Sequence, residues 1–115
     1  MLTTHHPMNN QMSPWGNIQN AADIAPGIVE VSTSSHGGIK VSNELWQKMP
    51  EYTRQTTYSK GGWFEEDCDV CLVVVCFPSL FEKYGNIEQA KQIIEGTYPS
   101  IAQRMKQDGI WDNGL

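Results

Sequence analysis

The sequence predicts a compact α+β domain, with a β-hairpin or small antiparallel sheet packed against three or four helices. Residues 28–41 contain β-branched residues in partial alternation with polar ones, which is typical of half-buried strands. Residues 87–107 instead carry apolar residues at helical spacing. Between them, residues 70–77 form a continuous apolar run that must be buried. A chain of 115 residues suits one domain with one modest core.

The N-terminal region predicts a tail followed by two turns. Residues 1–12 are polar and offer little to bury, so we expect a disordered tail before a single domain over residues 13–115. Residues 13–16, Ser-Pro-Trp-Gly, are typical of a turn around a large aromatic side chain that is buried. Residues 23–27 end in Pro-Gly and predict a second turn.

Residues 28–33 and 39–41 favour two strands, whose side chains alternate between two faces. The break between them predicts a β-hairpin with His36, Gly37 and Gly38 in its connection, because glycine permits backbone angles closed to other residues.

Helix signals follow the hairpin. Ser42 or Asn43 is expected to cap a short helix over residues 44–48, which Pro50 stops. Residues 51–60 are polar and predict a loop. In the C-terminal third we expect a short helix over residues 78–84 and helices over residues 87–95 and 99–107, the first of these two capped by Asn86.

Residues 65–77 are harder to interpret. Valine, cysteine and phenylalanine favour a strand. The acidic residues 65–67, however, stand at the beginning of the segment, as a helix dipole prefers, and Pro78 stands at its end. We favour a central buried helix over a strand.

Composition limits the function. Eight basic residues are scattered among 13 acidic ones, for a formal net charge of -5, which argues against direct nucleic-acid binding and suits a basic protein partner. The longest apolar run is far shorter than the roughly 20 residues of a membrane-spanning helix. The N-terminus has no basic start followed by an apolar stretch, so we expect no secretory signal. Three crowded cysteines are no disulfide framework, so we expect a cytoplasmic protein.

The most informative segment is residues 61–69, Gly-Gly-Trp-Phe-Glu-Glu-Asp-Cys-Asp, which leads into the apolar run. Negative charge beside a buried segment costs free energy unless a helix N-terminus, a cation, a basic partner or a catalytic role compensates it. If it is a binding surface, the aromatic and acidic residues would face a basic groove and imitate nucleic-acid phosphates. The candidate binding residues are His36, Trp63, Phe64, Glu65, Glu66, Asp67 and Asp69.

A catalytic interpretation uses part of the same segment. His36 could activate Cys68 at a helix start, or Asp67 could orient His36 and leave a serine such as Ser35 as the nucleophile. Acidic neighbours oppose a thiolate at Cys68, so we assign no catalytic residue and keep this as the alternative. Cys68 and Cys71 have the spacing of half a zinc site, but the other half is missing, so we predict no metal and no cofactor.

Several blocks together resemble a known family. They are residues 13–16, 24–29, 31–38 and 61–69, with Phe77-Pro78 beyond, which correspond to patterns SPWG, STxSHGG and GGW(F/Y)EEDCD. This combination, over roughly residues 13–81, is similar to small uncharacterised proteins of bacteriophages, plasmids and other mobile elements. The chain departs from that pattern at Ser34, where proline is usual, and at Val70-Cys71, where Trp-Ala is usual. Cys71 therefore receives no family-wide role.

The resemblance implies a mobile-element accessory protein in a bacterial cell. Together with the acidic charge, it leads us to expect binding to a host protein or nucleoprotein complex, with inhibition of a bacterial defence system, as anti-CRISPR proteins do. The alternative is a small hydrolase or a ligand- or metal-binding protein that uses His36 with Glu65, Glu66, Asp67 and Cys68.

Overall fold

The computed structural model describes residues 6–115 and confirms the α+β prediction. Its main sheet has four antiparallel strands in the order β3-β4-β5-β6. A separate two-stranded ribbon pairs β1 with β2. The strands are β1 (Met12–Ser13), β2 (Gly16–Asn17), β3 (Asn20–Ala25), β4 (Ile28–Ser32), β5 (Gly37–Val41) and β6 (Trp63–Glu65).

The described residues form five α-helices, where the sequence predicted three or four. They are α1 (Asn43–Lys48), α2 (Asp69–Cys76), α3 (Ile87–Thr97), α4 (Pro99–Gln107) and α5 (Ile110–Asn113), with short 3-10 segments η1 (Glu51–Thr53), η2 (Ser59–Gly61) and η3 (Pro78–Phe81). The predicted caps at Ser42 and Asn86 are confirmed, because each side chain accepts a hydrogen bond from the helix backbone. Helix α3 runs through Gly96 to Thr97 rather than ending at residue 95.

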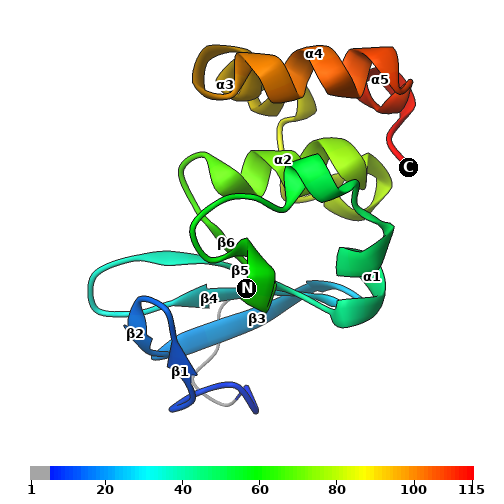
Figure 1. Cartoon of the computed structure of the whole chain (residues 1–115). Helices are drawn as coiled ribbons and strands as arrows, with labels where there is room; N and C mark the ends of the chain where they lie inside the picture. Colours follow the sequence, from blue (N-terminus) through cyan, green and yellow to red (C-terminus); the bar gives the residue numbers. More distant parts are fainter. Residues whose placement is uncertain (1–5) are drawn as a thin grey trace.

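The elements form layers, with α2 between the sheet and helices α3 to α5 (Figure 1). The sheet face toward α2 contributes Ile28, Ile39, Val41 and Phe64 to the main core. A second, smaller cluster on the other face joins Val31 to Ile18 and Ala21, beside Trp15. A helix covered on both sides must be apolar all round, so the predicted central buried helix is confirmed.

Strands β3 and β4 form one hairpin and β4 and β5 form a second, and both differ in part from the prediction. Pro26 and Gly27 form the expected tight turn, with φ of 90° at Gly27, but residues 23–25 belong to strand β3. Gly37 and Gly38 lie within β5, so their predicted place in the hairpin connection is wrong. The prediction assumed that these two glycines serve the geometry of a turn. In the structure they instead allow close packing between neighbouring strands. A β-carbon on Gly38 would stand 2.3 Å from the carbonyl oxygen of Phe64.

Strand β6 is one of the elements that sequence reasoning missed, together with β1, β2, β3 and α5. Trp63 pairs with Lys40 and Phe64 with Ile39, which extends the sheet by one edge strand. Helix α2 then begins only at Asp69. The acidic residues 65–67 therefore lie at the end of a strand and in the turn that follows, rather than in the first turn of a helix.

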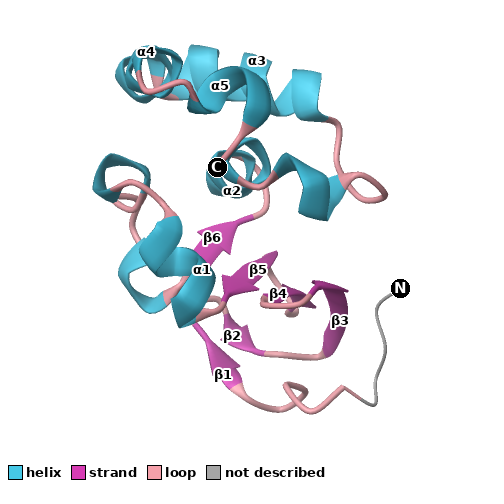
Figure 2. Ribbon diagram, turned by 90° about the vertical axis from the view of Figure 1, so that its right-hand side faces the viewer, coloured by secondary structure: helices cyan, strands magenta, loops and turns pink. Residues whose placement is uncertain are grey.

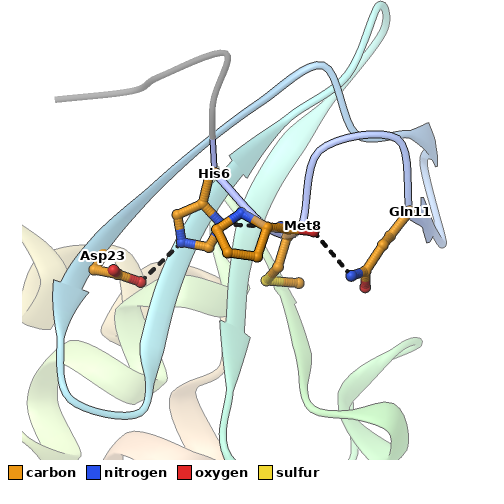
Figure 3. A network of polar contacts seen from close by, with 5 residues as sticks. His6, Met8, Gln11 and Asp23 are labelled. Carbon is orange, nitrogen blue, oxygen red and sulfur yellow. Dashed lines mark hydrogen bonds and ion pairs between the residues drawn. The ribbon is translucent and has the colours of Figure 1, made fainter.

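The N-terminal segment packs on the sheet where we expected a tail. Residues 1–5 of that predicted tail lie outside the described residues. The His6 ring lies 2.9 Å from an Asp23 carboxylate oxygen, and its other nitrogen accepts the Met8 amide hydrogen bond (Figure 3). The Ile18 amide donates to the Gln11 carbonyl at 2.9 Å. The polar contacts that hold this segment are thus made to Asp23 of β3 and to Ile18, the residue after β2.

Across residues 6–115, no helix combines the length and apolar character that crossing a membrane requires.

Candidate functional site: an acidic cleft beside the histidine loop

A cleft of about 430 Å³ lies between the main sheet, α2, and the loop that leads into α3. Figure 2 shows these elements, with α2 between the sheet and α3. The lining of the cleft includes polar Ser32, Asn86 and Gln89, and we call the apolar part of the lining the wall. The three exposed carboxylates and the exposed aromatic ring that also line the cleft form what we call its rim. The wall includes Ile24, Ile39, Val70, Val74, Phe81 and Ile93, and the rim includes Glu30, Glu66, Asp67 and Tyr84.

The sheet positions two of the rim carboxylates. Glu30 pairs with Ile39 across β4 and β5, so its side chain shares the face of that core residue. The Glu66 amide donates to the Gly37 carbonyl at 3.1 Å. Its carboxylate lies over Gly37, 2.7 Å from where a β-carbon would stand. Asp67 follows in the turn before α2. All three acids are exposed.

The negative charge of the rim is not balanced within the described chain. The ion pairs of residues 6–115 lie elsewhere: His6–Asp23, Lys91–Glu88, Arg104–Asp108 and Lys106–Glu95. No lysine or arginine lines the cleft. A concave, partly apolar surface with unpaired carboxylates concentrates negative potential and attracts cations.

His36 lies close to this rim but is not paired with it. Its backbone is fixed by Thr33, which accepts from the His36 amide at 3.1 Å and donates to its carbonyl at 2.7 Å. The imidazole is exposed, and within residues 6–115 it forms no ion pair with a carboxylate. The structure therefore places His36 next to Gly37, over which Glu66 lies, without joining the two side chains.

Within the described part of the chain, the residues of the catalytic alternative are not joined into a catalytic group by hydrogen bonds or ion pairs. The Cys68 sulfur accepts a long hydrogen bond of 3.9 Å from the Thr97 hydroxyl, and it forms no hydrogen bond with His36 within residues 6–115. Asp67 likewise forms no ion pair with His36 there. The residues described contain no cluster of three His, Cys, Asp or Glu side chains that could hold a metal ion.

Two predicted binding residues are structural instead. Asp69 is 7% exposed and accepts a short hydrogen bond from the Tyr98 hydroxyl at 2.5 Å. Burial, with this bond to Asp69, raises the pKa of Tyr98. Phe64 is fully buried in the main core. Neither side chain is available to a partner.

Trp63 and Glu65 are partly exposed but do not line the cleft. The Trp63 ring packs edge-on against Trp15 at 5.8 Å, and the Lys40 ammonium lies 5.6 Å from it. Of the predicted residues, Glu66 and Asp67 alone form part of the cleft.

Sequence reasoning missed Glu30 and Tyr84. Glu30 could have been recognised from the sequence, because residues 28 and 30 of a strand lie on the same face. A carboxylate on the face of buried Ile28 indicates that this part of the core face is open to water. Tyr84 had none, because its place on the rim depends on the fold of the loop before α3.

Two of the three thiols are buried in α2. Burial raises the pKa of Cys76 to about 12. Burial, with the neighbouring Cys68 and Asp69, raises the pKa of Cys71 to about 11. Both therefore stay protonated at neutral pH, and protonated thiols are poor nucleophiles and metal ligands.

Fold and cleft together define a small α+β domain with an acidic, partly apolar cleft. The chain belongs to the family described as a domain of unknown function, DUF7007, whose profile matches residues 8–110. Searches of curated proteins and of solved structures found no match. The family profile begins within the segment that the structure packs onto the sheet.

Proposed function

We propose that this chain is a mobile-element accessory protein that binds a host protein or nucleoprotein complex in the bacterial cytoplasm and inhibits a defence system. The observation that carries the proposal is the set of exposed, unpaired carboxylates around one cleft. The net charge of -5 and the small size support it. The sequence resemblance supports the mobile-element context.

Charge gives the proposal its mechanism. Proteins that handle nucleic acid carry grooves of lysine and arginine that neutralise phosphates. A small acidic protein can compete for such a groove, because complementary potentials speed encounter and select the partner. Inhibition of this kind requires no turnover by the inhibitor.

The direct experiment measures phage plating on bacteria that carry a nuclease-based defence system, with and without this chain. The wild-type chain should restore plating, and the variant Glu66→Gln/Asp67→Asn should not. Circular dichroism should show that this variant remains folded. The matched control Glu44→Gln/Glu51→Gln removes two exposed acids outside the cleft and should act like wild type. If the variant Glu66→Gln/Asp67→Asn restores phage plating as fully as the wild-type chain does, the proposal is contradicted.

A second candidate is a ligand-binding protein or small hydrolase, and of the residues expected for it, His36, Glu65, Glu66, Asp67 and Cys68, the cleft brings together Glu66 and Asp67. The cleft volume favours it, since small-molecule sites typically measure about 300–1,000 Å³. The same variants separate the two functions. Loss of turnover of a small substrate with the protein interaction retained would favour the enzyme.

A further inference from the structure

We propose that the cleft seats an arginine side chain presented by an extended segment of the partner protein. The inference rests on the proposed function in one respect only, that the ligand belongs to a protein. It names the group that the site recognises, and the chemistry of the cleft carries it.

The wall and the rim of the cleft match the two ends of an arginine side chain. Apolar groups such as Ile39 and Val74 suit its three methylene groups, which pack on apolar surface while the charged head stays in water. Glu30, Glu66 and Asp67 line the same cleft and are exposed, so their carboxylates can meet the charged head on the side open to water. A long cationic side chain therefore fits both surfaces of the site at once.

Charge complementarity favours a cation over any other occupant. Three carboxylates and no basic side chain line the cleft, and within residues 6–115 none of the three forms an ion pair. A bound cation relieves the repulsion among them, whereas a bound anion or nucleic acid increases it. The site thus selects against phosphate-bearing ligands.

The geometry of the rim favours guanidinium over ammonium. Glu66 and Asp67 come from the turn before α2, and Glu30 comes from β4. A planar guanidinium with five donors can bond carboxylates in more than one direction, which a point-like ammonium does less well. Tyr84 is 54% exposed at the rim and offers a ring on which the same plane can stack.

Room in the cleft favours a peptide segment over a free cation. The volume of about 430 Å³ leaves space beside one arginine side chain for apolar neighbours. The apolar wall rewards such neighbours, since buried apolar area stabilises binding. The occupant that uses the whole site is an arginine flanked by apolar residues in an extended chain.

The test uses isothermal titration of the full chain with the blocked peptide acetyl-Leu-Arg-Leu-amide at low salt. We expect saturable binding that weakens as salt is raised. Glu66→Gln should weaken it about tenfold, the size of one charge-assisted hydrogen bond. The triple variant Glu30→Gln/Glu66→Gln/Asp67→Asn should abolish it. Tyr84→Ala should weaken it severalfold, and Tyr84→Phe should not.

Two controls separate recognition from bulk charge. The triple variant Glu44→Gln/Glu51→Gln/Asp112→Asn makes the same charge change at exposed, unpaired acids outside the cleft, and it should bind like wild type. A peptide with citrulline in place of arginine keeps the shape and loses the charge, and it should not bind. Equal loss in both triple variants would overturn the inference, as would equal binding of the citrulline peptide.

Other outcomes overturn the inference in distinct ways. No binding at millimolar peptide rules out the site. Spermidine binding with equal affinity and the same dependence on the three acids would make the cleft a site for small cations. If the chain binds the arginine peptide but does not restore phage plating, the proposed defence role is wrong and arginine recognition by the cleft stands. If restored plating depends on the three acids but the cleft shows no preference for arginine, the arginine inference is wrong and the defence role stands.

Discussion

Gly38 lies where three segments of the fold meet. A β-carbon there would stand 2.3 Å from the Phe64 carbonyl oxygen and 2.5 Å from the Trp15 ring. The neighbouring strand is backbone and cannot move aside without breaking the pairing of β5 with β6. The absence of a side chain at Gly38 therefore lets Trp15 cover this face of the sheet.

Substitution of Gly38 should be far more harmful than substitution of Gly96. We expect Gly38→Ala to lower the free energy of unfolding by about 1–3 kcal/mol, the usual cost of overpacking. Gly96→Ala is the matched control, because nothing lies within 4 Å of its would-be β-carbon and alanine favours a helix interior by up to about 1 kcal/mol. Urea denaturation of both variants measures the difference. Equal effects would contradict the packing role of Gly38.

At the residue scale, the sequence offers only local signals. Glu66 and Asp67 stand out in sequence because they cluster beside an apolar run, and both line the cleft. Asp69 belongs to the same cluster, yet it is buried, and Tyr98, 29 residues away, donates a hydrogen bond to it. No local pattern distinguishes a carboxylate that meets water from one that meets a distant hydroxyl.

Helix α2 shows how tertiary context decides an element. Its residues favour a strand by intrinsic preference. Strand β6 of the sheet and helices α3 and α5 pack against it, and its burial on both sides is what its uniform apolar character predicts. The prediction of a helix succeeded for that reason. Strand β6 escaped prediction because only three residues form it and its partner β5 is distant in sequence.

The thiols of α2 predict a loss of stability at alkaline pH. Burial raises the pKa of Cys71 to about 11 and of Cys76 to about 12, from an ordinary value of 9.0. Between these values the unfolded chain loses protons that the folded chain keeps. The stabilisation is therefore complete below pH 9 and falls as pH rises, by up to about 1.4 kcal/mol per pH unit for each thiol.

The matched variant is Cys71→Ala/Cys76→Ala. It should be less stable than wild type at neutral pH because it leaves cavities, yet its stability should change less between pH 9 and pH 11. Tyr52 and Tyr98 also have raised pKa values and steepen the upper part of the curve in both proteins. Urea denaturation across this range measures both slopes. Parallel curves would mean that the thiols ionise as freely in the folded chain as in the unfolded one.

At the scale of the whole molecule, layering explains both the stability and the cleft. Helix α2 has only 8 residues, while the sheet and helix α3 flank it on both sides (Figures 1 and 2). Sheet residues that α2 does not reach, such as Glu30, face water inside the cleft. The sequence predicted the layers of sheet and helices. It could not predict the cleft, because the cleft depends on how far each layer extends over the next.

The most direct test of the acidic cleft is a nuclear magnetic resonance titration of the isotope-labelled chain with acetyl-Leu-Arg-Leu-amide. We predict that backbone shifts concentrate at Glu30, Glu66, Asp67 and the residues around Asn86, and that they vanish in Glu30→Gln/Glu66→Gln/Asp67→Asn. Shifts spread over the outer helices, or shifts that persist in that variant, would contradict the account.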